Sequence, residues 1–368
     1  MCHPLLKYCV VIILSGLLTQ GCATTDLPSF ENTERVQLQD DETRVWNRSK
    51  EEQQRLDSSH YLYQDPGLSV YVNQVAQKLV PRDLADKELE IEVKILRNPQ
   101  LNAFAYPNGV IYLHTGILAK MENEAQLAAL IGHEMTHVTH RHAIENFRSV
   151  KNTTALLSTV QLATMPFGVY GDLANILGSV GAMAAISGYS KEAEREADRE
   201  GLQLMIDAGY DPREAPRLFE HLQKDVRQQE IQEPYFFGSH PRLQERIDNY
   251  NKFLQESPMA LDGVRNTDLF IQHVTPLILD NAILDLSMGR FQSAQKGIED
   301  FLGRRPQDAE AHFWYGEFYR QRNKATDLEK AIIHYRTAIT CDRKLPEPYR
   351  ALGLIYYKQQ AYAKARSN

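Results

Sequence analysis

Two histidines lie four residues apart in the segment His133-Glu134-Met-Thr-His137, with a glutamate directly after the first. On an α-helix of about 3.6 residues per turn, the two imidazoles fall on one face roughly one turn apart, so both can reach the same metal ion. Glu134 points about 100° away from them, where it can hold a water molecule on that metal. A catalytic zinc needs three protein ligands and one open position. The spacing therefore predicts metal-assisted hydrolysis.

The helix that must carry the two histidines has a clear start and an apolar stripe. Asn123, with Gln126 three positions later, is typical of a capped helix N-terminus. An ordinary buried helix with satisfied core histidines shows the same pattern, because a five-residue motif with two free positions also arises by chance. Apolar residues follow the start at helical spacing, namely Leu127, Leu130, Ile131, Met135 and Val138.

A second charged segment, residues 190–201, offers the missing third ligand. Its carboxylates Glu194 and Asp198 are also four residues apart. On a helix packed against the first, Glu194 can complete a site of two histidines and one carboxylate, while Asp198 accepts a hydrogen bond from the other ring nitrogen of a ligand histidine. Taken alone, such a charged run is more often a solvated helix face with salt-bridged neighbours.

Together, the two segments resemble the HtpX/BepA-type zinc metallopeptidases, a family of His-Glu-x-x-His gluzincins related to the CAAX prenyl protease. The resemblance covers about residues 60 to 255, and BepA-like periplasmic members also carry C-terminal tetratricopeptide repeats. Three further stretches support it: Tyr63-Gln-Asp-Pro-Gly-Leu, residues 102–116, and Ser239-His240-Pro241 followed by Arg246-Ile247. The resemblance implies one Zn²⁺ per chain, with ligands His133, His137 and Glu194, the catalytic base Glu134 and the supporting carboxylate Asp198.

The resemblance also implies a reaction and two further site residues. The zinc lowers the pKa of its bound water towards about 7, and Glu134 takes the proton as that water attacks a peptide carbonyl. His240 is then expected near the zinc, where it fills the open position or contacts the substrate, and Arg246 is expected to stabilise the oxyanion. A histidine and an arginine close to a loop are also common as surface or capping residues.

The chain ahead of the metal-binding helix is expected to form a strand pair. Pro107-Asn108-Gly109 is a turn signal, and the β-rich run 110–113 follows it. An exposed edge strand beside the site can take an extended peptide by β-augmentation, although a plain structural hairpin fits equally well. Between the two metal-binding segments, residues 153–188 form two apolar runs too short to span a membrane comfortably. We expect a helical hairpin over the active site there, with interfacial membrane contact as the alternative.

The N-terminus resembles a bacterial lipoprotein signal. Lys7 precedes the apolar run 8–18, and Thr19-Gln20-Gly21-Cys22 follows as an imperfect lipobox. We expect cleavage before Cys22 and lipid on that cysteine, which anchors the protein to a membrane. Ala23 favours the outer membrane, on its periplasmic side. The alternative is an ordinary cleaved signal and a soluble periplasmic protein.

The composition excludes two other classes of protein. The four cysteines provide no disulfide framework, because two leave with the signal and Cys22 is the lipidation site. A net charge of -7 and a pI near 6.0 give no basic field for nucleic acid, so no nucleic-acid partner is expected.

From about residue 265, small residues recur at a long period. Ala282 and Gly316 are thirty-four residues apart, which is the tetratricopeptide period, and Gly353 follows after a short insertion. Ala294, Ala331 and Ala365 also occupy like positions: the insertion lies between the first two, and the last two are thirty-four residues apart. We expect stacked helical pairs whose concave face binds a protein or peptide partner, or which brace the protease.

The sequence therefore predicts an α+β chain: a mainly helical zincin-type metallopeptidase domain with a small β-sheet, followed by an α-solenoid of tetratricopeptide repeats. The expected function is that of a zinc-dependent endopeptidase of the bacterial cell envelope. It degrades misassembled or unfolded proteins, outer-membrane proteins among them, and an assembly-machinery partner binds its repeats. The alternative is a non-proteolytic scaffold or chaperone lipoprotein. The expected divisions are 1–21 (lipoprotein signal peptide), 22–58 (lipidated tether and N-terminal helix), 59–262 (zinc metallopeptidase domain) and 263–368 (tetratricopeptide-like repeats, the last incomplete).

Overall fold

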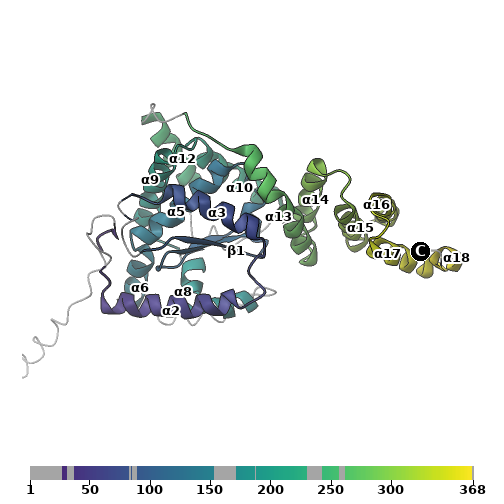
Figure 1. The fold of residues 1–368 in the computed structure, drawn as a ribbon, viewed down its shortest axis with the longest axis horizontal. Helices are drawn as coiled ribbons and strands as arrows, with labels where there is room; N and C mark the ends of the chain where they lie inside the picture. Colours follow the sequence, from purple (N-terminus) through teal and green to yellow (C-terminus); the bar gives the residue numbers. More distant parts are fainter. Residues whose placement is uncertain are drawn as a thin grey trace, which may run out of the picture.

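The computed structural model describes residues 27–30, 37–82, 84, 89–152, 171–186, 188–229, 243–256 and 262–366. A body of helices around a small sheet is followed by a row of helical pairs that leads away from it (Figure 1). This architecture confirms the predicted fold class. Within the described ranges the helices are α2 (Asp40–Asp57), α3 (Pro66–Leu79), α4 (Thr115–Leu118), α5 (Glu124–Thr139), α6 (His142–Asn152), α8 (Gly171–Ile186), α9 (Lys191–Asp207), α10 (Glu214–Gln229), α12 (Leu243–Glu256), α13 (Thr267–Ser287), α14 (Phe291–Arg304), α15 (Ala309–Arg322), α16 (Asp327–Cys341), α17 (Pro346–Lys358) and α18 (Tyr362–Arg366).

The sheet has three strands, β1 (Glu92–Leu96), β2 (Ala103–Ala105) and β3 (Val110–His114), in the order β1-β3-β2. β1 runs parallel to β3, and β2 runs antiparallel to it. The turn predicted from the sequence joins β2 to β3. Gly109 in that turn has a φ of 98°, and an added Cβ would lie 2.2 Å from the Glu90 carbonyl oxygen, so only glycine fits.

Side chains of β3 alternate between two apolar cores, as the two-residue period of a strand requires. Ile111 and Leu113 pack into a core with residues of α3 and α5. Val110 and Tyr112 point to the other side, into a core with residues of α2 and α8. The sheet accordingly lies between α2 on one side and α3 with α5 on the other (Figure 1).

α5 is the central helix of the body, and every one of its residues is buried. It begins as predicted, because the side chain of Asn123 accepts a hydrogen bond from the backbone N–H of Gln126 at 3.0 Å. The carboxylate of Glu124 accepts hydrogen bonds from the hydroxyls of Tyr71 (2.7 Å) and Tyr210 (2.6 Å). A carboxylate in the first turn is also favoured by the helix dipole.

The outer strand β2 is covered, so the described residues favour the structural hairpin over the exposed edge strand, the two alternatives for this strand pair. All three residues of β2 are buried. Just before them, the side chain of Asn102 donates to the carbonyl of Ala185 in α8 at 3.3 Å. α8 is fixed in turn by Glu52 of α2, whose carboxylate accepts from the backbone N–H groups of Val180 (3.2 Å) and Gly181 (2.9 Å).

Residues 27–30 pack against the body, although they lie in the segment 22–58 that was expected to begin as a tether. Leu27 and Phe30 are buried. The hydroxyl of Ser29 donates to the carbonyl of Thr139 at the end of α5 (3.2 Å). The signal segment with Cys22 and residues 153–170 of the expected hairpin lie outside the described residues.

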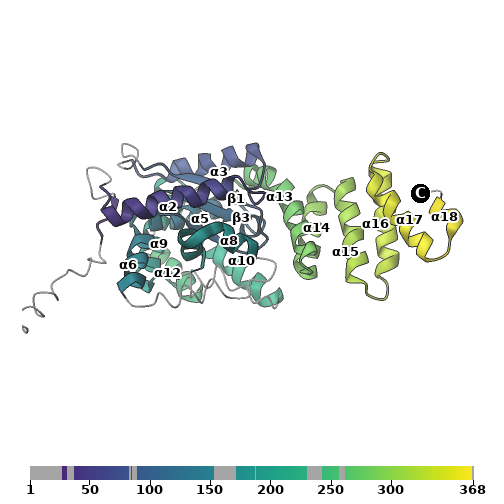
Figure 2. The same ribbon diagram turned by 90° about the horizontal axis from the view of Figure 1, so that it is seen from below.

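Three helical pairs extend from the body: α13 with α14, α15 with α16, and α17 with α18 (Figure 2). Small residues lie where the helices of a pair meet. A Cβ added to Gly297 would lie 2.8 Å from that of Ala282, and one added to Gly316 would lie 2.5 Å from the ring of Tyr335. These contacts confirm the helical pairs that the thirty-four-residue period predicts.

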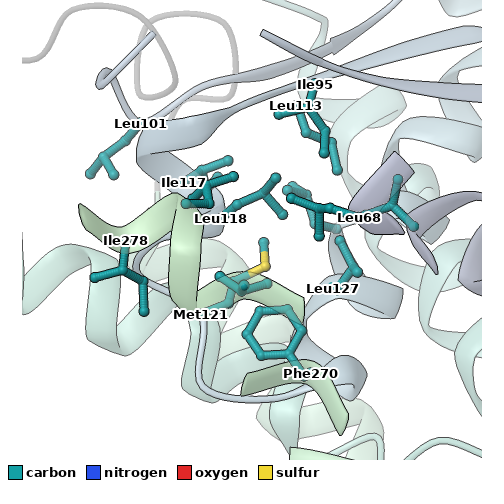
Figure 3. Close-up of a cluster of buried hydrophobic side chains, with 14 of the residues drawn as sticks. Leu68, Ile95, Leu101, Leu113, Ile117, Leu118, Met121, Leu127, Phe270 and Ile278 are labelled. Carbon is teal, nitrogen blue, oxygen red and sulfur yellow. The ribbon is translucent and has the colours of Figure 1, made fainter. Parts of the chain in front are cut away.

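α13 belongs to the body as much as to the repeats. Its Phe270 and Ile278 pack in one apolar cluster with Leu118, Met121 and Leu127 (Figure 3). In the part of the chain that the structure describes, α13 is the one helix long and apolar enough to cross a membrane, and 56% of its apolar window is buried. Packing therefore explains its apolar character. The expected boundary between residues 262 and 263 stays a prediction, because the core continues across it.

Candidate metal centre

α5 and α9 cross at two glycines beside the first histidine. A Cβ on Gly132 would lie 2.8 Å from the carbonyl oxygen of Gly201, and a Cβ on Gly201 would lie 2.7 Å from the backbone nitrogen of His133. Only glycine lets the two backbones approach so closely. The crossing brings Glu194 and Asp198 of α9 next to the histidines of α5.

The three predicted metal ligands meet at this crossing. His133 Nε2 lies 3.1 Å from His137 Nε2. Glu194 Oε2 lies 3.6 Å from His133 Nε2, and its Oε1 lies 3.5 Å from His137 Nε2. All three residues are buried, and their ligand atoms lie within 4.8 Å of one another.

This donor set fits zinc. Imidazole nitrogens and a carboxylate oxygen are ligands that Zn²⁺ prefers, and three of them suit a catalytic site. The pKa of His133 is lowered to about 4, first by burial and then by the charge of Arg246, so the ring is neutral at pH 7. Three atoms with lone pairs directed at one buried point repel each other, and a cation between them removes that repulsion.

Asp198 supports His133 from the side away from the metal ligands. Its Oδ1 lies 3.1 Å from His133 Nδ1, which is the contact that the residue spacing predicts. Arg246 donates to the same oxygen through Nη2 (2.7 Å), and the Tyr250 hydroxyl donates to it at 2.8 Å. Burial raises the pKa of Asp198, but the charge of Arg246 and these hydrogen bonds hold it well below its usual range. Asp198 is therefore an anion that fixes the ring of His133.

The contacts of Arg246 favour a positioning role over the expected oxyanion role. Its guanidinium is 2% exposed, pairs with Asp198 and lies over the ring of Phe219 at 4.1 Å. Arg246 Nη2 also lies 2.9 Å from His133 Nδ1. The Nδ1–H of His133 donates to Asp198. The contact between His133 Nδ1 and Arg246 Nη2 is therefore a contact between two donors and not a hydrogen bond. Both groups instead share the carboxylate.

His137 is supported by two residues, His142 and Tyr189, that are not among the predicted site residues. Its Nδ1 lies 2.9 Å from His142 Nδ1. Its ring stacks on that of Tyr189, with centroids 3.9 Å apart and planes 15° apart. Tyr189 lies two residues before α9, next to the N-cap Ser190, and no sequence pattern marks it. His142 is the second histidine after the motif, but its position relative to His137 depends on how the chain turns after α5.

Glu134 is fully buried on α5 between the two histidines. Burial raises the pKa of Tyr189 above its usual range, and the charges of Glu134 and Glu194 raise it further. His240, expected to fill or guard the open metal position, lies outside the described residues.

A helical metallopeptidase of the zincin class is the type of protein that this fold and this buried centre define. The sequence profile of peptidase family M48 matches residues 68–253, half of the chain, and the chain belongs to this family. A tetratricopeptide repeat profile matches residues 316–360.

Several curated proteins are similar to part of this chain. The beta-barrel assembly-enhancing protease of Escherichia coli strain K12 is 28% identical over 214 residues, which cover 57% of this chain and 44% of that protein. The mitochondrial metalloendopeptidase OMA1 of Schizosaccharomyces pombe is 30% identical over 190 residues, 51% of this chain and 54% of that protein. The Arabidopsis thaliana OMA1 is 38% identical over 133 residues, 36% of this chain and 26% of that protein. The chain thus spans about half the length or less of these relatives.

Proposed function

We propose that this chain is a zinc-dependent endopeptidase. The observation that carries the proposal is the position of Glu134, buried on α5 between two histidines whose rings converge with Glu194. When bound there, zinc lowers the pKa of a water molecule to near 7 and polarises the substrate carbonyl. Glu134 takes the proton of the attacking water and passes it to the leaving amine. Asp198 keeps the hydrogen of His133 on Nδ1 and so leaves Nε2 free to bind the metal.

We propose that the substrates are proteins of the bacterial cell envelope that have stalled during assembly, outer-membrane proteins included. The support is the similarity to a beta-barrel assembly-enhancing protease over 214 residues, 57% of this chain. In this view the enzyme works in quality control, because a protein that has failed to fold exposes extended segments that a folded protein does not.

The repeats are proposed to bind a protein partner, such as a component of the assembly machinery. Between α15 and α17 lies a groove whose lining includes Leu328 and Leu354, which are 40% and 58% exposed. Arg320 and Arg350 also line it. Exposed apolar side chains with charged neighbours are typical of protein interaction surfaces.

We further propose that the protein is periplasmic and anchored to the outer membrane by lipid on Cys22. The support is the signal-like segment and its lipobox. Metabolic labelling with a fatty acid followed by membrane fractionation tests this. Label should enter the wild type and be lost in Cys22→Ala, whereas an unlabelled, soluble wild type would show an ordinary secretory signal.

The catalytic proposal is tested by Glu134→Gln. Zinc content and fold should be retained, while digestion of an unfolded substrate such as casein should fall about 10²- to 10⁴-fold, the range for loss of a general base. His137→Ala is the comparison variant, and it should lose zinc as well as activity. Full activity of Glu134→Gln would exclude the peptidase mechanism. A wild type that recruits partners but cleaves nothing would favour the alternative, a non-proteolytic scaffold or chaperone.

A further inference from the structure

We propose that His142 is a positioning residue for the zinc ligand His137: it accepts a hydrogen bond from His137 Nδ1–H, and Glu196 fixes the tautomer in which it can do so. The proposal rests on the zinc site proposed above. The two Nδ1 atoms lie 2.9 Å apart, and His142 Nε2 lies 3.1 Å from Glu196 Oε2. The side chain of His142 is only 3% exposed, so bulk water does not replace these partners.

The placement of hydrogens decides which ring donates. His137 Nε2 faces the other ligand atoms, 3.1 Å from His133 Nε2 and 3.5 Å from Glu194 Oε1, so it must present a lone pair. A neutral imidazole has one N–H, and that of His137 is therefore on Nδ1. His142 Nδ1 must then be bare, with its own hydrogen on Nε2, where Glu196 accepts it.

The chain reverses sharply to bring the two histidines together. α5 ends at Thr139, Arg141 has a φ of 63°, and α6 begins at His142. The left-handed conformation is unfavourable for a residue other than glycine, because its Cβ crowds the backbone. Arg141 offsets that cost through a buried ion pair with Glu42 of α2 and a hydrogen bond to the carbonyl of Pro28 (3.2 Å). An N-terminal helix remote in sequence thus holds the turn that carries His142.

The two ligand histidines are held by different chemistry. His133 donates to the carboxylate of Asp198, whereas His137 donates to an imidazole. A carboxylate makes a ligand histidine more basic, while an uncharged acceptor acts mainly by fixing the direction of the ring. Another uncharged acceptor at the same point should therefore replace His142. Asparagine puts its amide oxygen near the position of Nδ1, and glutamine puts it near that of Nε2.

The test measures zinc affinity of the full chain against a competing chelator, with His142 replaced in turn by leucine, glutamine and asparagine. His142→Leu removes the acceptor and His142→Gln displaces it, so both should weaken zinc binding about 10- to 100-fold. His142→Asn should bind zinc nearly as tightly as the wild type. Wild-type affinity in His142→Leu, or equal weakness of the asparagine and leucine variants, would overturn the proposal.

A matched control lies two residues away. His140 is 14% exposed and also faces Glu196, at 3.8 Å, so His140→Leu should leave zinc affinity unchanged. Circular dichroism of the chelated proteins checks the fold, and if the leucine variant of His142 does not fold, the asparagine and glutamine pair decides. A wild type that binds no zinc would contradict the proposed function. If the wild type binds zinc and the His142 variants bind it with the same affinity, only the present proposal is contradicted.

Nitrogen NMR of the zinc-loaded chain with ¹⁵N-labelled histidine reads the tautomers directly. His142 should carry its hydrogen on Nε2, and His137 should carry its hydrogen on Nδ1. In Glu196→Leu, the fraction of His142 with its hydrogen on Nδ1 should rise, which a purely structural packing role would not require. A wild-type His142 with its hydrogen on Nδ1 would overturn the proposal.

Discussion

Asp198 and Arg246 join α9 to α12 through a buried ion pair beside the metal centre, with side chains 1% and 2% exposed. Taking two charges out of water is costly, and their attraction repays it only when the remaining polar atoms are also satisfied. Tyr250 and His133 supply those contacts to the carboxylate. The pair therefore stabilises this region mainly because loss of either partner would leave the other as an uncompensated buried charge.

Arg246→Met should lower the free energy of unfolding by about 3–5 kcal/mol, the cost of leaving one partner of a buried pair alone. Urea unfolding in the presence of a chelator measures this without a contribution from zinc. Adding Asp198→Asn to that variant should restore part of the loss. Arg195→Met is the control, since Arg195 pairs with Glu245 between the same two helices but is 55% exposed, and it should cost no more than about 1 kcal/mol. Equal losses in Arg246→Met and Arg195→Met would contradict the argument.

The ligand set was predictable because each pair of residues sits on one helix, where the spacing fixes the geometry. His133 with His137 and Glu194 with Asp198 are such pairs. The partners of the ligands were not predictable in the same way. His142 reaches His137 only because Arg141 turns the chain, and the pairing of Arg246 depends on how α12 packs.

At the scale of elements, the metal centre depends on how closely α5 and α9 approach. Gly132 and Gly201 form the contact, one residue from His133. A Cβ atom added at either glycine would press against the backbone of the other helix, and no change of side-chain rotamer could relieve that contact. The distance between the histidines and Glu194 is therefore set by the absence of two side chains.

Gly201→Ala should destabilise the fold by about 1–3 kcal/mol, as overpacking does, and should weaken zinc binding because Glu194 moves away from the histidines. Thermal melting with and without zinc, together with a chelator titration, measures both effects. Gly303→Ala in α14 is the control, because nothing lies within 4 Å of its added Cβ. That change should stabilise the helix by about 0.5–1 kcal/mol and leave zinc affinity unchanged. Normal zinc affinity in Gly201→Ala would show that the crossing tolerates a wider spacing.

Local sequence patterns predicted the elements well wherever the pattern itself was sufficient. The cap at Asn123, the turn before Gly109 and the period of the repeats each gave the correct element. The cover over β2 was missed because it depends on tertiary contacts. Glu52 of α2 holds α8 beside that strand, and no rule of strand composition contains this information.

At the scale of the whole molecule, the peptidase body and the repeats share one continuous apolar core. The segment that joins them is part of the body: the carbonyl of Arg265 accepts from the backbone N–H of Glu124 at the start of α5 (2.9 Å). The hydroxyl of Tyr63 donates to Asp280 of α13 at 2.6 Å. The rigid attachment of the first repeat follows from these contacts.

A chain truncated after residue 262 should therefore fail to fold stably. It loses Phe270, Val274 and Leu277, which are fully buried, and each such side chain contributes about 1.5–3 kcal/mol, against a total stability of about 5–15 kcal/mol. A chain that ends after Arg304 keeps α13 and α14 and should melt cooperatively. Thermal unfolding followed by circular dichroism compares the two. Cooperative melting of the shorter chain at the temperature of the longer one would show that α13 is dispensable for the body.

The docking of residues 27–30 limits where such an enzyme can act. Leu27 donates its N–H to Glu145 at 2.9 Å, and Ser29 donates to the end of α5, the helix of both ligand histidines. Cys22 precedes Leu27 by only five residues, and five residues of fully extended chain reach at most about 18 Å. With lipid on Cys22, as proposed, the centre would diffuse in two dimensions within a shallow layer above the bilayer. Its encounter rate with a client would then depend on the density of clients per unit area of membrane, and a client in the bulk periplasm would seldom meet it.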